Sequence, residues 1–102
     1  MPLDWEIVKK KYGGEKRVEV PYIAGGKKFR VTGVTDKEIF VSTIANPKVP
    51  IKRENLERMV MLIETQRVKM DLETLTDDFR TLVEDNRATS AISILKDLGY
   101  VK

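Results

Sequence analysis

Three consecutive runs of alternating apolar and polar residues occupy the middle of this chain, and this period-two pattern limits its fold more than any other feature. Such alternation is typical of a strand that buries one face. Apolar residues recur at helical spacing before the runs, over residues 3–12, and after them, from residue 53 onward. A group of strands followed by a group of helices predicts an α+β fold.

The three runs cover residues 17–22, 28–33 and 38–43, and the segments between them are turn-like. Short connections predict an antiparallel meander with one buried face. Pro21 has no backbone N–H for a ladder hydrogen bond, so the first run is predicted to be an edge strand. Residues 49–51 could add a short strand, which makes the predicted sheet three- to four-stranded.

The register of these strands follows from the requirement that their apolar faces coincide. The predicted neighbours are Val18 with Val31, Val20 with Phe29, Glu19 with Arg30 and Arg17 with Thr32 in the first pair of strands, and Val31 with Val41, Gly33 with Ile39, Phe40 with Thr32 and Ser42 with Arg30 in the second. The outer face of the sheet would then carry Arg17, Lys28, Arg30 and one aromatic side chain, Phe40.

Four helices are expected, a short one before the sheet and three after it that pack on one face. They span residues 3–12, 53–66, 72–83 and 88–98. Their predicted caps and stops are Asp4 and Gly13 for the first helix, Asp71 or Thr76 for the third, and Thr89 or Ser90 with Gly99 for the fourth. The predicted core joins Val18, Val20, Tyr22, Phe29, Val31, Ile39 and Val41 to Leu56, Val60, Ile63, Phe79, Leu82, Ile92 and Leu95. Residues 1–102 are expected to form a single domain.

The absence of two residue types restricts the chemistry available to this chain. It contains no His and no Cys, so the commonest general base, the thiolate nucleophile and the usual zinc ligands are missing. The acidic pairs Asp77–Asp78 and Glu84–Asp85 are neighbours in predicted helices, where adjacent side chains point about 100° apart and do not converge on a metal. We therefore expect a protein that is not an enzyme and that uses no cofactor and no metal.

The net charge of +3 conceals an uneven distribution along the chain. Residues 1–53 hold 12 Lys and Arg against 6 Asp and Glu, a charge of +6, whereas residues 54–102 hold 7 against 10, a charge of −3. This asymmetry indicates where an anionic partner would dock. The chain has no apolar run that could span a bilayer and no signal-peptide pattern, so we expect a cytoplasmic protein with no membrane partner.

A basic cluster in the first half is the main candidate site. Clustered cations that neutralise phosphates supply most sequence-independent affinity for nucleic acid, and an aromatic side chain among them can stack on a base. The candidate residues are Lys9, Lys10, Lys11, Lys16, Arg17, Lys27, Lys28, Arg30, Phe40, Lys52 and Arg53. The sequence thus predicts a non-enzymatic module that binds DNA or RNA through a basic surface of the sheet and first helix.

An excess of apolar side chains supports an alternative. Four short elements do not obviously bury Trp5, Met59, Met61, Met70, Ile94 and Tyr100. A continuous exposed patch of such residues would mark a surface for a protein partner or a homodimer. The alternative function is therefore a protein-interaction module, such as an assembly or regulatory subunit.

A third hypothesis comes from residues 76–102, two helical patterns separated by a short turn. The ending Ser93-Ile94-Leu95-Lys96-Asp97-Leu98-Gly99-Tyr100-Val101-Lys102 resembles the recognition helix and exit of winged helix-turn-helix domains. The resemblance implies a DNA reader whose last helix presents Thr89, Ser90, Ser93, Lys96 and Asp97. That face lacks the Arg, Asn or Gln side chains that read bases with two hydrogen bonds, so ordinary packing of a helical hairpin is the favoured explanation of the pattern.

Overall fold

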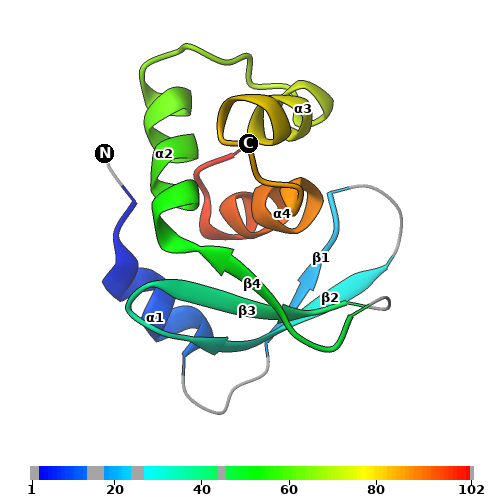
Figure 1. Cartoon of the computed structure of the whole chain (residues 1–102). Coiled ribbons are helices and arrows are strands. Elements are labelled where there is room, and N and C mark those ends of the chain that lie inside the picture. Colours follow the sequence, from blue (N-terminus) through cyan, green and yellow to red (C-terminus); the bar gives the residue numbers. More distant parts are fainter. Residues whose placement is uncertain (1–2, 14–17, 24–26, 44–45, 102) are drawn as a thin grey trace.

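The structure is a computed structural model that describes residues 3–13, 18–23, 27–43 and 46–101. Its elements in chain order are α1 (Trp5–Tyr12), β1 (Val18–Pro21), β2 (Lys28–Val34), β3 (Glu38–Ser42), β4 (Val49–Lys52), α2 (Arg53–Glu64), α3 (Leu72–Leu82) and α4 (Ala88–Leu98). The predicted α+β architecture is confirmed: a short helix precedes a four-stranded antiparallel meander of order β1-β2-β3-β4, and three helices follow. Figure 1 shows α2, α3 and α4 stacked on one side of this sheet.

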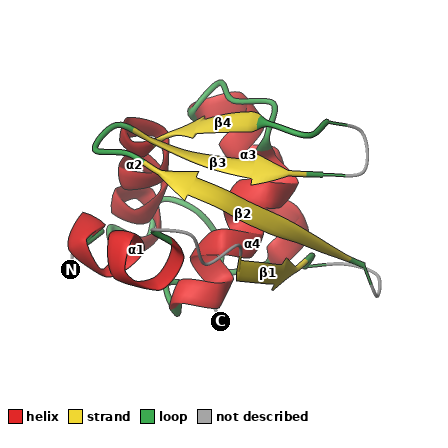
Figure 2. Cartoon of the chain, turned by 90° about the horizontal axis from the view of Figure 1, so that it is seen from below, coloured by secondary structure: helices red, strands yellow, loops and turns green. Residues whose placement is uncertain are grey.

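The opposite face of the sheet is open in the part of the chain that the structure describes. Seen from below in Figure 2, the strands lie in front of α2, α3 and α4, and no helix crosses them. α1 lies beside β2 rather than over it (Figure 2). It occupies the place next to the second half of β2 because β1 pairs only with residues 28–31. The sheet therefore has a covered face and a face available to a partner.

The predicted register is correct for the first pair of strands and partly wrong for the second. Val18 pairs with Val31 and Val20 with Phe29, as expected, and the Arg17–Thr32 pair lies outside the described residues. Between β2 and β3 a register shift falls at residues 31–33, so Phe40 lies opposite Gly33 and Ile39 opposite Val34. The prediction had placed Gly33 opposite Ile39 on the core face. The bulge moves glycine, which has no side chain to bury, to the outer face and brings Val34 to the apolar one.

Local hydrogen-bonding rules explain the N-termini of α1 and α3 and the C-terminus of α4. Asp4 accepts a hydrogen bond from the N–H of Glu6, and Asp71 accepts one from the N–H of Thr74, as N-caps do. Gly99 ends α4 at φ 94°, in the left-handed region that favours glycine. The predicted N-caps of α4, Thr89 and Ser90, are wrong, because the helix begins at Ala88. Asp85 instead accepts a hydrogen bond from the N–H of Arg87 just before it.

The core fills the space between the covered face and the helices. Its fully buried members include Phe29, Val31, Ile39 and Val41 from the strands. α4 is the central helix, with five consecutive buried residues over 91–95. Leu82, predicted to be buried, is 51% exposed, because α3 buries Leu75, Phe79 and the following Val83 at i, i+4 and i+8.

Candidate nucleic-acid interface

The strands direct one set of side chains onto the open face of the sheet. Because successive strand residues alternate between faces, the neighbours of the buried strand residues all point to the open side. They are Glu19 and Pro21 from β1, Lys28, Arg30 and Thr32 from β2, Glu38, Phe40 and Ser42 from β3, and Pro50 and Lys52 from β4. We call these residues the open face.

Phe40 lies near the middle of the open face on the inner strand β3. Its side chain is half-buried, with Gly33 opposite it on β2 and Pro50 opposite it on β4. The ammonium group of Lys48 lies 4.7 Å from the centre of the Phe40 ring, within the range of a cation–π interaction. Lys48 was not among the predicted site residues. Only the register of β4, whose residue Pro50 pairs with Phe40, reveals that a lysine two positions earlier reaches this ring.

The two strands on either side of β3 carry cations on the open face. Lys28 and Lys52 are exposed on β2 and β4. Arg30 is also exposed, and its ion pair with Glu19 is long, at 3.9 Å between the nitrogen and the carboxylate oxygen. Because both side chains of that pair are more than half exposed, the pairing contributes little and a phosphate can compete for the guanidinium. Lys27 lies exposed at the β1–β2 hairpin, beside the open face.

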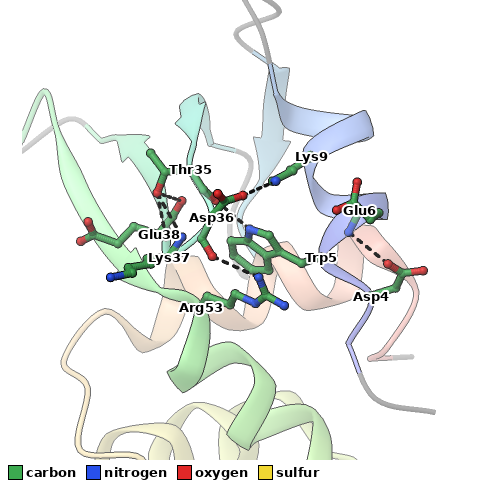
Figure 3. Close-up of polar contacts among 9 residues, drawn as sticks. All are labelled: Asp4, Trp5, Glu6, Lys9, Thr35, Asp36, Lys37, Glu38 and Arg53. Atoms are coloured by element: carbon green, nitrogen blue, oxygen red, sulfur yellow. Dashed lines mark hydrogen bonds and ion pairs between the residues drawn. The ribbon is translucent and has the colours of Figure 1, made fainter.

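Lys9 and Arg53, two of the predicted cations, make structural contacts around the β2–β3 turn. Figure 3 shows Lys9 of α1 directed at Asp36 in the β2–β3 turn, with which it forms an ion pair. This hydrogen-bonded pair lowers the pKa of Asp36 and raises the pKa of Lys9. Arg53 donates to the backbone oxygen of Asp36 at 3.1 Å, and its guanidinium lies 5.3 Å from the Trp5 ring centre (Figure 3). Arg53 also pairs with Glu57 at 3.4 Å.

The remaining cations of the cluster lie away from Phe40 or outside the described residues. Lys11 forms an ion pair with Asp97 at 3.1 Å and donates to the Asp97 backbone oxygen at 2.7 Å, which ties α1 to the end of α4. Lys10 is exposed on α1. Lys16 and Arg17 lie outside the described residues. The structure therefore divides the predicted cluster into a sheet group around Phe40 and a group of α1 and α2 residues with structural partners.

The last helix does not present the face that the helix-turn-helix resemblance implies. Ser93 is 1% exposed, and its hydroxyl accepts a hydrogen bond from the N–H of Ile23 and donates one to the backbone oxygen of Thr89. The prediction of Ser93 on an outward face is wrong, because α4 is packed against β1, α2 and α3. Of the five residues expected on that face, only Lys96 is well exposed.

Most of the apolar side chains that were candidates for a protein-interaction surface are buried inside the fold. Trp5, Met59 and Ile94 are buried and Tyr100 is half-buried, which leaves Met61 and Met70 as the exposed members of that set. Among the described residues no three carboxylates converge as a metal site would require. None of the helices in the described ranges has the length and apolar composition of a membrane span.

Asp85 is the one buried carboxylate among the described residues, and its contacts join three elements. Its Oδ2 accepts a hydrogen bond of 2.9 Å from the side-chain amide of Asn55 on α2. Its Oδ1 accepts one of 2.9 Å from the N–H of Arg87, and the Arg87 guanidinium lies 3.8 Å away. These contacts fix the turn between α3 and α4 relative to α2.

A groove of about 630 Å³ lies beside the open face. It is found at the end of the sheet where β1 and β3 finish and β2 and β4 begin, next to the start of α4. Its lining residues are Tyr22, Thr43, Asn46, Lys48, Val49, Pro50, Asn86, Arg87, Thr89 and Ser90. No sequence pattern predicted it, because its residues come from three separate stretches of the chain.

The geometry thus brings Lys28, Arg30, Phe40 and Lys52 together on one face and adds Lys48, which sequence reasoning missed. Four cations against the two carboxylates Glu19 and Glu38 give this surface a charge of +2. Comparison with models of protein families, with curated proteins and with solved structures found no match to this chain.

Proposed function

We propose that this protein binds single-stranded nucleic acid on the open face of its sheet and catalyses no reaction. The observation that carries the proposal is the position of Phe40, on an inner strand of an uncovered sheet face, with the ammonium group of Lys48 at 4.7 Å from its ring. An uncovered aromatic ring among cations is the arrangement that single-strand binding proteins use.

The residues around Phe40 have complementary roles in this proposal. The ring offers a platform on which an unpaired base stacks, a contact worth about 1 to 3 kcal/mol. Lys28, Arg30, Lys48 and Lys52 neutralise phosphates on either side of the stacked base. A base inside a duplex is already stacked on its neighbours, so the platform favours single strands over duplexes.

Fluorescence anisotropy with labelled single- and double-stranded DNA and RNA at several salt concentrations tests this proposal. We expect affinity for single strands that falls steeply with salt, with a slope that the double variant Lys28→Ala/Arg30→Ala reduces by about 0.7 for each phosphate contact removed. Phe40→Ala should weaken binding by roughly tenfold or more with little change in the slope, because the ring carries no charge.

The matched control removes two cations from the opposite side of the molecule. Arg67 and Lys69 are exposed in the connection between α2 and α3, and Arg67→Ala/Lys69→Ala changes the net charge by the same amount as Lys28→Ala/Arg30→Ala. If both double variants weaken binding equally, the interaction is a general charge effect and the open face is not the site. Unaltered affinity in Phe40→Ala would exclude the stacking role.

A protein-interaction function is the second candidate, supported by the exposed side chains of Met61 on α2 and Leu82 on α3. Met61 lies in a shallow groove of about 400 Å³ whose other lining residues are Glu54, Glu57, Arg58, Glu64 and Thr65. Sedimentation of the protein without nucleic acid tests this function. A discrete dimer together with no binding to any nucleic acid would favour it over the open face.

A further inference from the structure

The groove at the end of the sheet has a lining suited to anions. Two cations, Lys48 and Arg87, line it, and no carboxylate does. Most of its other lining residues carry amide or hydroxyl groups, which can donate hydrogen bonds to a phosphate oxygen. The same groove has few apolar side chains with which to hold an apolar ligand, so its chemistry favours a phosphate group.

Of the two cations of the groove, Lys48 has no ion pair within the described part of the chain, and Arg87 has a long one. Among the described residues no carboxylate lies within ion-pair distance of the Lys48 ammonium group, which instead contacts the Phe40 ring. Arg87 lies 3.8 Å from Asp85, a long ion pair, and its side chain is 46% exposed. Asp85 already accepts hydrogen bonds from Asn55 and from the N–H of Arg87. The Arg87 guanidinium therefore has donors to spare for a ligand.

Several uncharged side chains of the groove also have hydrogen-bond donors that no other described residue uses. The side chains of Asn46, Asn86, Thr89 and Ser90 make no hydrogen bond to any residue that the structure describes. Thr89 and Ser90 belong to the first turn of α4, and Asn46 belongs to the loop between β3 and β4. Donors from both walls of the groove can thus reach one ligand.

The groove adjoins the open face through two shared residues. Lys48 lines the groove and also lies over the ring of Phe40. Pro50 lines the groove and is the neighbour of Phe40 across the β3–β4 ladder. A single-stranded nucleic acid with one base stacked on Phe40 can therefore continue over β4 into the groove.

We propose that this groove is a second, phosphate-binding subsite for the nucleic-acid strand, which receives its backbone beyond the nucleotide stacked on Phe40. The inference rests on the proposed function, since the open face is what delivers the strand. Lys48 links the two subsites, and Arg87 is the cation specific to the groove. A free phosphate offers the same chemistry as a phosphodiester, so the experiment must separate these two sources.

The test measures affinity for single-stranded oligonucleotides of increasing length, from about 4 to about 12 nucleotides, a range that spans the site sizes of comparable single-strand binding folds. Arg87→Gln should leave the affinity for the shortest oligonucleotides unchanged. It should weaken binding of the longer ones by roughly three- to tenfold and lower their salt slope by about 0.7. Phe40→Ala should weaken binding at every length.

Arg80→Gln is the matched control. Arg80 on α3 is also 46% exposed and also forms an ion pair with an aspartate, Asp77, at 3.3 Å. Both variants lose one charge and one ion pair, and thermal melting of both checks that the fold is retained. Equal affinity of Arg87→Gln and Arg80→Gln for long oligonucleotides, with weakened binding by Phe40→Ala, would overturn the groove subsite and leave the proposed function standing.

Titration with inorganic phosphate, monitored through the amide chemical shifts of residues 86–90, distinguishes a site for free phosphate from a site for the phosphodiester backbone. We expect no saturable shift at millimolar phosphate, and saturable shifts with the longer oligonucleotides. Saturation by phosphate alone, with oligonucleotide affinity unchanged in Arg87→Gln, would assign the groove to a free phosphate and overturn the inference. Absence of oligonucleotide binding by the unaltered protein would overturn both proposals.

Discussion

The ammonium group of Lys48 lies 4.7 Å from the centre of the Phe40 ring, although the two residues are eight positions apart in the chain and only one of them belongs to a strand. The lysine comes from the loop before β4, and the ring comes from β3. Their contact joins the flat open face to the polar groove at its end. A positive charge over an aromatic ring in contact with solvent is worth about 0.5 to 1 kcal/mol, so a ligand can displace it at small cost.

The two phenylalanines on the neighbouring strands β2 and β3 should differ in how much each contributes to stability. Phe29 is buried in the core, whereas Phe40 is half-buried on the open face. Phe29→Ala should cost about 3 to 5 kcal/mol of unfolding free energy, because it opens a cavity, and Phe40→Ala should cost clearly less. Urea denaturation measures both. Equal losses would mean that the Phe40 ring is part of the core.

An aspartate introduced at either of two successive positions of β2 tests which residues of this strand face the core. Val31 is fully buried, and Thr32 is exposed on the open face. Val31→Asp should unfold the protein, because an unpaired carboxylate would enter the core, while Thr32→Asp should melt cooperatively near the temperature of the unaltered protein. Circular dichroism during heating distinguishes them. A cooperatively melting Val31→Asp protein would contradict the assigned faces of β2.

The Tyr12 hydroxyl should make stability depend on alkaline pH. Burial, together with the hydrogen bond that Tyr12 donates to Asp97, raises the pKa of Tyr12 above its ordinary value of 10.0. The folded state therefore retains this proton after the unfolded chain has lost it. The contribution is fully present below about pH 10 and decreases as the pH rises above that value.

Tyr12→Phe removes the hydroxyl and retains the buried ring. The variant should lose about 1 kcal/mol at neutral pH, and its deficit relative to the unaltered protein should shrink above about pH 10. Urea titrations of both proteins at pH 8 and above measure this difference. The lysines are the same in the two proteins, so their titration cancels when the two unfolding free energies are subtracted. A deficit that stays constant across the alkaline range would contradict the assigned contact.

Removal of the buried carboxylate of Asp85 should loosen the attachment of the turn between α3 and α4. Asp85→Ala deprives the Asn55 amide and the N–H of Arg87 of their acceptor, which should cost about 1 to 3 kcal/mol. Asn55→Ala should cost less, because Asp85 then retains the N–H of Arg87. Hydrogen exchange at residues 85–91 measures the local effect. Unchanged protection of that segment in Asp85→Ala would contradict the role assigned to this side chain.

Local rules predicted most of the fold from the sequence. The alternation in β1 and β2 and the caps Asp4, Asp71 and Gly99 each depend on neighbouring residues, and the structure confirms them. The bulge near Gly33 was not predicted, because an inserted residue in a strand leaves the alternation before it intact. The exposure of Leu82 was not predicted either, because the helix pattern allowed both Leu82 and Val83 to face the core.

The candidate site was less predictable than the fold because charge alone does not say which partner a side chain meets. Lys9 and Lys11 find carboxylates from residues far along the chain, Asp36 and Asp97. Lys48 reaches Phe40 only through the pairing of β3 with β4. Each of these contacts depends on how distant segments pack together. The spacing of apolar residues predicts helices and strands but does not show which charged side chains will meet.

The attachment of α1 has a consequence for the order in which the chain can complete its fold during synthesis. Its first turn and last turn are tied to residues far along the sequence, through the bond from the N–H of Asp4 to the Tyr100 hydroxyl and through the bond from Tyr12 to Asp97. The meander, in contrast, pairs only strands that are neighbours in sequence. On the ribosome the sheet can therefore form, and Lys9 of α1 can pair with Asp36, as soon as β4 has emerged, whereas the bonds from Asp4 and Tyr12 must wait until α4 and Tyr100 have been made.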